Sequence, residues 1–271
     1  MGAAAVISGT TRWYAVLGDP VTQVRAPELL NPVLARFDAV LVPLHVRPGD
    51  LAGTLAGLDR VRNLDGLLVT VPHKAAVRRL AAAAGPAAIL AGTANALRRR
   101  PGGGWFAENF DGLGFVRGLT AAGHAVAGRR FGLAGAGGAG SAIAVALLDA
   151  GAAGVAVSDV DAGRRDAVVA RLEAVAPGRI HAVSPAAVTD ADVVVNATPL
   201  GMRPGDRLPF DPAAAAPGTL VVDIIMKPRE TELLRKAAES GFAVHHGSHM
   251  LDQQLGCYRD FFGWPVNSLV C

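Results

Sequence analysis

A glycine-rich turn between two short apolar stretches is the most informative chemical pattern in the chain. Arg130-Phe-Gly-Leu-Ala-Gly-Ala-Gly-Gly-Ala-Gly140 contains the turn, and Ser158-Asp-Val-Asp161 ends the second apolar stretch. Gly135 allows a tight turn, Gly137 lets the backbone approach a phosphate, and Gly140 lets the following helix pack on the strand. The N–H groups at the start of that helix would point at the same phosphates. This order of elements predicts a site for the pyrophosphate of a dinucleotide.

A carboxylate stands at the end of the second apolar stretch. Asp159 follows Gly140 by nineteen residues. At that distance it can accept hydrogen bonds from both ribose hydroxyls, and it would repel a 2′-phosphate. We therefore expect NAD as the cofactor, with NADP less favoured. The alternative is a glycine turn in an α/β domain that holds no ligand.

A second set of polar residues could carry proton transfer. Lys74 follows the turn Thr70-Val-Pro-His73, just past a strand end and on the first turn of a helix. Strand ends of this kind form ligand sites in α/β sheets. A lysine there can exchange a proton with a carbonyl or hydroxyl oxygen, although a solvated helix lysine is the plainer interpretation. The set is completed by Asn95, Asp111 and Gln254. Asp111 could equally be the N-cap of a helix, and Gln254 could equally be an exposed polar residue.

Alternating strand and helix patterns must position these residues. In the first half we expect strands at 13–17, 39–46 and 66–71, helices at 27–37, 48–58 and 74–83, and a hairpin joining 95–97 to 105–107. In the second half we expect strands at 132–134, 155–158, 180–182, 193–196 and 220–225, and helices at 111–123, 139–149, 230–240 and 250–262. The alternation predicts an α/β fold with two domains, 1–112 with 244–271 and 113–243, and an active site in the cleft between them.

Composition excludes several classes of protein. Hydrophobic residues make up 51% of the 271 residues and charged residues 18%, so the chain can form a sizeable core. The longest basic run, Arg98 to Arg100, reads as a hairpin tip rather than a nucleic-acid arm. Cys257 and Cys271 form no CxxC pair, so we expect no disulfide framework and no metal site. Met1–Ser8 lacks the features of a signal peptide, and the apolar run after Gly140 is too short to cross a bilayer. We expect a cytoplasmic protein without membrane or nucleic-acid partners.

Eight blocks of sequence, spread from the first strand to the last helix, form one pattern. They are Gly18-Asp-Pro20 with Pro27 and Asn31, Val69-Thr-Val-Pro-His-Lys74, Gly92 to Leu97, Asn109-Phe-Asp-Gly112, Gly135-Ala-Gly-Gly-Ala139, Asn196-Ala-Thr-Pro-Leu-Gly-Met202, Asp223 with Pro228, and Gly247-Ser-His-Met-Leu251 with Gln254. In these blocks the chain resembles the shikimate/quinate dehydrogenase family. The resemblance implies an N-terminal α/β substrate domain and a Rossmann dinucleotide-binding domain, with the C-terminal helices returning to the first.

The resemblance also implies a reaction and the residues that carry it out. A shikimate- or quinate-like cyclic alcohol and its 3-dehydroshikimate-like ketone would be interconverted with NAD, with Lys74 and Asp111 as the proton-transfer pair. The implied substrate-binding residues are Thr70, Asn95 and Gln254, together with Gln23, Val24 and Ala26. The implied cofactor-binding residues are Gly135, Ala136, Gly137, Gly138, Ala139, Asp159, Asn196, Thr198, Met202, Met226 and Gly247. Whether the reaction serves aromatic amino acid biosynthesis or catabolism stays open.

The chain departs from the family pattern at the end that holds the substrate carboxylate. Family members usually carry a Ser-x-Ser pair where this chain has Val24-Arg25-Ala26. Each lost hydrogen bond to a charged group costs about 1.5–3 kcal/mol, unless a residue at 22, 23 or 25 compensates. Leu68 replaces a usual Asn, and Met226 replaces a usual Tyr. With these changes, the substrate could instead be a related polyol that lacks the carboxylate.

Three further alternatives stay open. The chain could be a non-catalytic NAD- or metabolite-binding regulator on the same scaffold, but retention of both Lys74 and Asp111 argues against this. It could be a two-domain dehydrogenase of the methylene-folate or amino-acid type, but the lysine block and residues 250–254 argue against this. It could also be a soluble α/β domain of no assignable chemistry. We expect a small-molecule substrate as the partner and a monomer or homodimer as the assembly.

Overall fold

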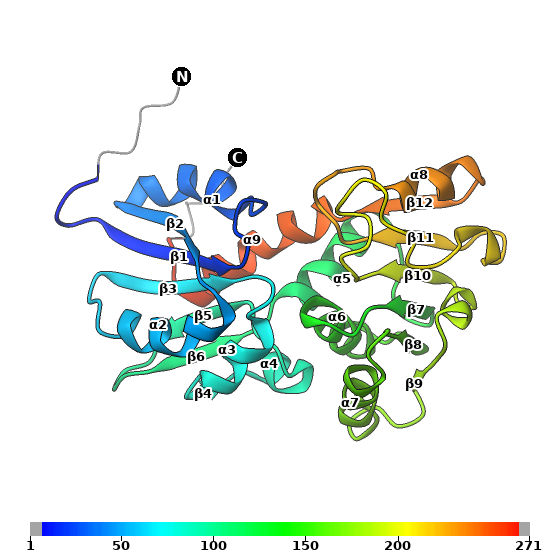
Figure 1. The fold of residues 1–271 in the computed structure, drawn as a ribbon, viewed down its shortest axis with the longest axis horizontal. Helices are drawn as coiled ribbons and strands as arrows, with labels where there is room; N and C mark the ends of the chain where they lie inside the picture. Colours follow the sequence, from blue (N-terminus) through cyan, green and yellow to red (C-terminus); the bar gives the residue numbers. More distant parts are fainter. Residues whose placement is uncertain (1–6, 266–271) are drawn as a thin grey trace. The chain divides into compact units, whose positions relative to one another are not determined.

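The computed structural model describes residues 7–265, so the expectations for residues 1–6 and for Cys271 lie outside the described part of the chain. Within it, residues 7–89, 93–110 and 255–265 form a first compact unit, and residues 90–92 and 111–254 form a second (Figure 1). We predicted a return to the first unit at residue 244. Residues 244–254 instead belong to the second unit, because β12 (Ala243–His246) pairs with β11 (Leu220–Asp223).

The first unit contains a six-stranded mixed sheet in the order β2-β1-β3-β5-β6-β4. Its strands are β1 (Arg12–Gly18), β2 (Ala39–His45), β3 (Leu64–Val69), β4 (Ala83–Ala84), β5 (Ala96–Arg99) and β6 (Trp105–Glu108). β1 pairs in parallel with β2 and β3, whereas β5 pairs antiparallel with β3 and β6. The predicted hairpin is therefore β5–β6, and within this unit the two-residue β4 is the strand that had no counterpart among the expected strands.

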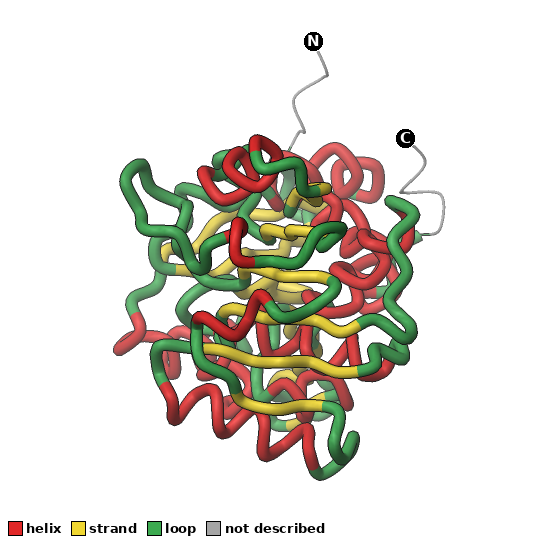
Figure 2. Tube along the Cα trace, turned by 90° about the vertical axis from the view of Figure 1, so that its right-hand side faces the viewer, coloured by secondary structure: helices red, strands yellow, loops and turns green. Residues whose placement is uncertain are grey.

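Helices cover both faces of this sheet. Figure 2 marks the helices (red) and strands (yellow) of both units along the chain. They are α1 (Ala26–Leu34), α2 (Leu51–Leu58), α3 (Lys74–Leu80), α4 (Pro86–Ala91) and the end of α9 (Ser248–Phe262), with short 3-10 turns at Ala35–Phe37 and Pro48–Asp50. Ala15 and Leu17 pack with α2 and α3, whereas Tyr14 and Val16 pack with α1 and α9. Successive strand residues point to opposite faces, so a strand covered on both sides must be apolar throughout.

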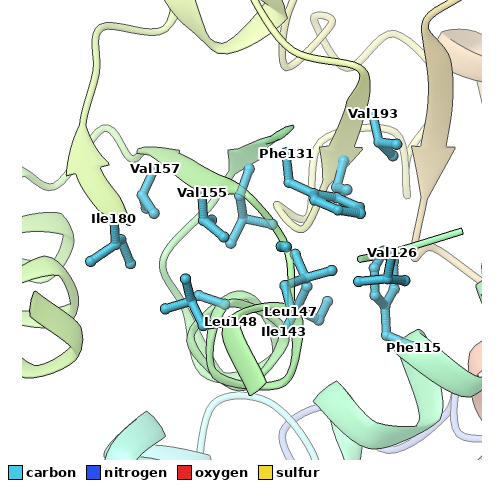
Figure 3. Close-up of a cluster of buried hydrophobic side chains, with 14 of the residues drawn as sticks. Phe115, Val126, Phe131, Ile143, Leu147, Leu148, Val155, Val157, Ile180 and Val193 are labelled. Carbon is cyan, nitrogen blue, oxygen red and sulfur yellow. The ribbon is translucent and has the colours of Figure 1, made fainter. Parts of the chain in front are cut away.

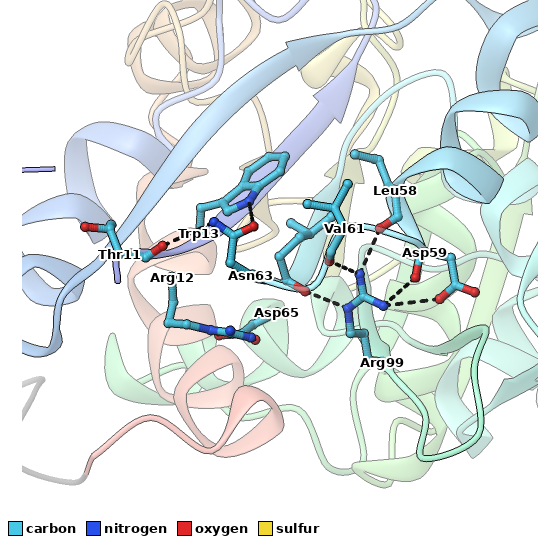
Figure 4. A network of polar contacts seen from close by, with 10 residues as sticks. Thr11, Arg12, Trp13, Leu58, Asp59, Val61, Asn63, Asp65 and Arg99 are labelled. Atoms are coloured by element: carbon cyan, nitrogen blue, oxygen red, sulfur yellow. Dashed lines mark hydrogen bonds and ion pairs between the residues drawn. The ribbon is translucent and has the colours of Figure 1, made fainter. Parts of the chain in front are cut away.

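The guanidinium of Arg99 donates hydrogen bonds to the backbone carbonyls at the end of α2. Arg99 donates to the carbonyl oxygens of Leu58 at 2.8 Å, Asp59 at 2.6 Å and Leu64 at 2.6 Å, and also to that of Val61 (Figure 4). The last carbonyls of a helix have no partner within the helix, and here an arginine supplies one. Arg99 is therefore a structural residue at the end of β5, rather than part of the charged hairpin tip that the sequence predicted.

The second unit contains a six-stranded parallel sheet in the order β12-β11-β10-β7-β8-β9. Its other strands are β7 (Arg130–Ala134), β8 (Gly154–Ser158), β9 (Ile180–Ala182) and β10 (Val193–Asn196). Counted from β7, the spatial order is 3-2-1-4-5-6, the doubly wound arrangement in which dinucleotides bind where the order reverses. That reversal lies between β7 and β10, at the carboxyl ends of both strands.

The helices of the second unit also divide between two faces. They are α5 (Asp111–Ala121), α6 (Gly138–Asp149), α7 (Ala162–Glu173), α8 (Glu232–Glu239) and the start of α9, with 3-10 turns at Ala186–Thr189 and Pro212–Ala214. Val193 and Val195 belong to the core cluster under α5, α6 and α7, which Figure 3 shows around Phe131 and Leu147. Val194 belongs to the opposite cluster under α8. Full burial of each such side chain stabilises the fold by about 1.5–3 kcal/mol.

Two further properties of the described chain bear on its assays and partners. The three tryptophans and two tyrosines of the sequence all lie in the first unit, at Trp13, Trp105, Trp264, Tyr14 and Tyr258. Among residues 7–265, no helix combines the length and hydrophobicity needed to cross a bilayer.

Candidate functional site

The glycine turn after β7 is tightly packed on one side and open on the other. Gly135 has a φ of +104°, and a Cβ there would lie 2.8 Å from the carbonyl carbon of Ala197. A Cβ at Gly140 would overlap the carbonyl oxygen of Gly135, so any side chain would push α6 off the turn. No atom lies within 4 Å of the Cβ position at Gly137, where α6 begins with Gly138. The turn therefore has room for a phosphate at the one glycine predicted to need it, next to a helix N-terminus.

Asp159 lies beside this turn, but its carboxylate is already hydrogen-bonded. Its Oδ2 accepts from the backbone N–H of Ala136 at 2.7 Å, and its Oδ1 accepts from that of Asp161 at 2.8 Å. Its side chain is 4% exposed, and Nη1 of Arg164 lies 3.7 Å from Oδ2. The carboxylate thus binds the glycine turn to the end of β8 and has a guanidinium next to it.

The loop after β10 is held by its own polar side chains. Asn196 is fully buried, and its Nδ2 donates to the carbonyl of Leu200 at 3.0 Å. Its Oδ1 accepts from the backbone N–H of Thr198 at 3.0 Å and from the Thr198 hydroxyl at 2.7 Å. Because these side chains stabilise the loop, Asn196 and Thr198 can offer a cofactor mainly backbone groups. Met202, further along the loop, is exposed.

A buried carboxylate behind this loop has a role that the sequence did not suggest. Asp223 ends β11 and accepts hydrogen bonds from Asn196 and Thr231. Burial raises the pKa of Asp223 to about 6. Met226 follows on the same connection and is half-buried. A Cβ at Gly247 would lie 2.5 Å from the carbonyl carbon of Ile224, so the start of α9 lies directly against this connection.

Asp111 and Gln254 meet within the second unit, between α5 and α9. Both side chains are buried, and Gln254 Nε2 donates to Asp111 Oδ1 at 3.2 Å. Glycines make the approach possible. A Cβ at Gly114 would lie 2.6 Å from Gln254 Cγ, and a Cβ at Gly118 would lie 3.1 Å from the carbonyl carbon of His249. The exposed position considered for Gln254 from the sequence was therefore wrong. Because Gly114 and Gly118 carry no side chains, α9 packs closely on α5 and the Gln254 side chain is buried between the two helices.

Lys74 and its neighbours occupy the carboxyl end of β3 in the first unit. Lys74 is the first residue of α3, and its carbonyl oxygen accepts from the N–H of Ala94 at 2.8 Å. His73 is buried and donates from Nε2 to the carbonyl of Val46 at 2.6 Å, so it anchors the turn before Lys74. Thr70 donates its N–H to Leu17 at 2.8 Å, which fixes the other end of the turn.

The remaining predicted substrate-binding residues lie in the same unit. Asn95 is 2% exposed, accepts from the N–H of Phe110 at 2.9 Å and donates to the Tyr258 hydroxyl at 3.1 Å. Val24 and Ala26 are half-buried and pack against the apolar cluster under α1. Gln23 donates from Nε2 to the carbonyl of Pro20 at 2.8 Å, while its buried Oε1 has no partner among the described residues.

The predicted site residues are divided between the two units. In the second unit, Asp111 accepts a hydrogen bond from Gln254, and Asp159 accepts one from the glycine turn. In the first unit, Lys74 and Asn95 lie near the adjoining ends of the neighbouring strands β3 and β5. No group of three metal-ligating side chains suited to a metal ion occurs among residues 7–265. A doubly wound parallel sheet with a glycine turn at its switch point defines the second unit as a Rossmann dinucleotide-binding domain, preceded by an α/β unit.

Comparison with known proteins agrees with this class. A family model described as the shikimate dehydrogenase substrate binding domain matches residues 16–97. Shikimate dehydrogenase (NADP(+)) of Rubrobacter xylanophilus is 36% identical over 252 residues, covering 90% of this chain and 88% of the relative. The structure of shikimate dehydrogenase from Aquifex aeolicus matches with a TM-score of 0.85 at 28% identity, covering 97% of both chains. The structure of 5-ketofructose reductase of Gluconobacter sp. strain CHM43 matches with a TM-score of 0.81 at 26% identity, covering 95% of both chains. The chain belongs to the shikimate dehydrogenase family and is an oxidoreductase of the dehydrogenase class.

The comparisons overturn the expected preference for NAD. The curated relatives at 34–36% identity are named shikimate dehydrogenase (NADP(+)), so NAD as the favoured cofactor was wrong. The structure supplies a physical reason. The prediction assumed that the Asp159 carboxylate would repel a 2′-phosphate, but its charge is compensated, because it accepts from two backbone N–H groups and has the Arg164 guanidinium beside it.

Proposed function

We propose that the protein interconverts a shikimate-like cyclic alcohol and its ketone with NADP(H), using Lys74 and Asp111 for proton transfer. The observation that carries this proposal is the buried Asp111 carboxylate at the start of α5, held by Gln254 at 3.2 Å. A carboxylate fixed in this way on a rigid helix is suited to hold a hydroxyl or an ammonium in one position. Lys74, at the start of α3, provides the exchangeable proton.

The site residues fit a dinucleotide. The open position at Gly137 and the start of α6 would hold the pyrophosphate, and the backbone of the 196–202 loop would line the nicotinamide side. Arg164 places a cation beside the end of β8, where a 2′-phosphate would be recognised. The bound cofactor supplies or accepts a hydride.

The residues of the chain would manage the proton that accompanies the hydride. In the direction of reduction, the Lys74 ammonium donates a proton to the oxygen of the ketone as that oxygen becomes an alkoxide. In the direction of oxidation, neutral Lys74 takes the hydroxyl proton. Asp111 orients the hydroxyl and stabilises the ammonium, and Asn95 and Gln254 bind the neighbouring ring hydroxyls.

Removal of the lysine amine tests the proposal. Lys74→Ala should lower kcat for shikimate oxidation by about 10²–10⁴-fold, the usual contribution of general acid–base catalysis, while NADP+ affinity stays within a factor of about two. Lys236→Ala removes an amine from an exposed position on α8 and serves as the matched control. Formation of the reduced cofactor is followed at 340 nm. Turnover of Lys74→Ala at the rate of the control would refute the role of Lys74.

A second candidate function is favoured by the apolar surroundings of Val24 and Ala26. Both pack against the cluster under α1, where a carboxylate would find no side-chain donor from either residue. We propose as the alternative the reduction of a ketone on a neutral polyol, the kind of substrate named for the structurally similar 5-ketofructose reductase. Assay of shikimate and 5-ketofructose side by side, in wild type and in V24S/A26S, separates the two. Preference of wild type for the neutral ketone, with a gain for shikimate in V24S/A26S, selects the alternative.

A further inference from the structure

Asp223 is a buried carboxylate that takes no part in the proposed proton transfer. It is the last residue of β11 and is 0% exposed. Its Oδ2 accepts from Asn196 Nδ2 at 3.1 Å and from the Thr231 hydroxyl at 2.7 Å, and its Oδ1 accepts from the N–H of Ile225 at 2.9 Å. Three hydrogen bonds compensate the carboxylate for the loss of water.

Each donor belongs to a different segment around the proposed nicotinamide side of the site. Asn196 begins the 196–202 loop and fixes it through its further bonds to Leu200 and Thr198. Ile225 lies on the connection that leads to Met226, and Thr231 is the N-cap of α8. One carboxylate therefore joins two loops and a helix start.

The same network extends to the glycine turn. Ala197, next to Asn196, donates its N–H to the carbonyl of Ala134 at 2.7 Å. The Cβ position of Gly135 lies 2.8 Å from Ala197, so the turn rests on the loop that Asp223 holds. A displacement of Asn196 would be passed to the pyrophosphate side of the site through these backbone contacts.

We propose that Asp223 is a positioning residue of the dinucleotide site, whose ionised carboxylate holds the 196–202 loop and whose protonation releases it. This inference rests on the proposed function, because it requires that the second unit bind a dinucleotide. The chemistry of the donors supplies the mechanism. Thr231 can change from donor to acceptor when the carboxyl gains a proton, but Asn196 Nδ2 and the N–H of Ile225 can only donate. Protonation therefore weakens the bond to Asn196 or to Ile225.

The pKa of Asp223 places this change in an accessible range. Burial raises it to about 6, whereas the bonds from Ile225, Thr231 and Asn196 lower it. The titratable and charged residues on neighbouring elements are His245 and His246 on β12, Glu232, Arg235, Lys236 and Glu239 on α8, and Lys227, Arg229 and Glu230 on the connection. Of these, Arg235 is bonded to Glu232 on the exposed side of α8, at 3.0 Å.

The experiment measures NADP+ affinity of the full chain by calorimetry between pH 8 and pH 5. Because the cofactor phosphate also titrates, every profile is divided by that of Asp223→Asn, which cannot ionise at this position. The ratio should show the wild-type Kd rising about tenfold from pH 8 to pH 5, as expected one pH unit below a controlling pKa of about 6. Thr231→Val removes one donor to the ionised form and should move the midpoint upward by about one pH unit.

Two variants separate positioning from general stability. Thr231→Ser keeps the hydroxyl and should restore the wild-type midpoint. Thr219→Val removes a buried hydroxyl at the other end of β11, where Thr219 donates to the carbonyl of Ala191 at 3.1 Å, and should leave the midpoint unchanged. His246→Gln should do the same.

The outcomes are distinct. A midpoint that Thr231→Val does not move, or a ratio that stays flat with pH, overturns the role of Asp223. If Asp223→Asn fails to fold, the midpoints of the two Thr231 variants relative to Thr219→Val decide the matter. Failure of the wild-type protein to bind NADP+ or NAD+ at pH 8 would instead refute the proposed function, and this inference with it.

Discussion

Replacing Gly114 on α5 with alanine should destabilise the protein, whereas the same replacement at an ordinary helix glycine stabilises it. A Cβ there would lie 2.6 Å from Gln254 Cγ and 2.7 Å from the carbonyl oxygen of Met250. Gly53 on α2 is exposed, with no atom within 4 Å of its Cβ position. The same substitution, Gly→Ala, can therefore be made in two helices with opposite surroundings.

The magnitudes follow from these surroundings. Alanine in place of glycine in a free helix interior stabilises by about 0.5–1 kcal/mol, which is the expectation for Gly53→Ala. At Gly114 the same gain is opposed by about 1–3 kcal/mol of overpacking. The displaced Gln254 also loses its bond to the Asp111 carboxylate, which costs about 1.5–3 kcal/mol. The balance is a destabilisation of the second unit by about 1.5–5.5 kcal/mol.

Urea unfolding followed by circular dichroism measures both effects, and steady-state kinetics measures the functional one. Because Asp111 belongs to the proposed catalytic pair, Gly114→Ala should also lower kcat by about tenfold, with NADP+ affinity unchanged. Equal midpoints for the two variants, or a gain in stability at Gly114, would show that α5 and α9 are not held at this distance. The burial of Gln254 would then have a cause other than the glycines of α5.

Two other residues carry predictions that depend on burial. Burial lowers the pKa of His245 to about 4, so between pH 6.5 and 4 the folded chain binds fewer protons than the unfolded chain and loses stability as the pH falls. His245→Gln should therefore lose about 2.5 kcal/mol less of its free energy of unfolding than the wild type between pH 7.5 and pH 4.5. Urea unfolding at the two pH values measures this difference. His181→Gln, at an exposed histidine, should lose as much as the wild type. Arg99→Lys should destabilise the first unit by about 2–4 kcal/mol, because an ammonium cannot reach the four carbonyls that one guanidinium satisfies. If Arg99→Lys unfolds at the same urea concentration as the wild type, hydrogen bonds from water replace those of the guanidinium without loss of stability.

The elements of the fold were predictable wherever the side-chain pattern was long and regular. The strands that became β1, β7, β8 and β10 are apolar because both faces of each sheet are covered, and this pattern can be read locally. β12 was missed because Ala243-Val-His-His246 lacks such a run, and it is held as an edge strand by pairing with β11. Its absence from the prediction also caused the misplaced domain boundary at residue 244.

The site was predictable in its backbone and less so in its side chains. Gly135 and Gly140 have the conformation or close contacts that their spacing implied. Residue type could not reveal that Asp159 faces the N–H of Ala136 rather than solvent, because the choice depends on a backbone brought near by the fold. The network around Asp223 could not be read from the sequence because its side-chain partners are 8 and 27 residues away.

The confinement of tryptophan and tyrosine to the first unit separates the optical signals of the two halves of the chain. Emission excited at 295 nm arises from Trp13, Trp105 and Trp264, so it reports only the environment of that unit. Far-ultraviolet ellipticity comes from helices in both units. When denaturation is followed by both tryptophan emission and ellipticity, the unfolding of the second unit is therefore obtained from the difference between the two curves. Phe242→Trp would add a fourth tryptophan, placed in the second unit, and its emission is obtained by subtracting the spectrum of the unsubstituted chain.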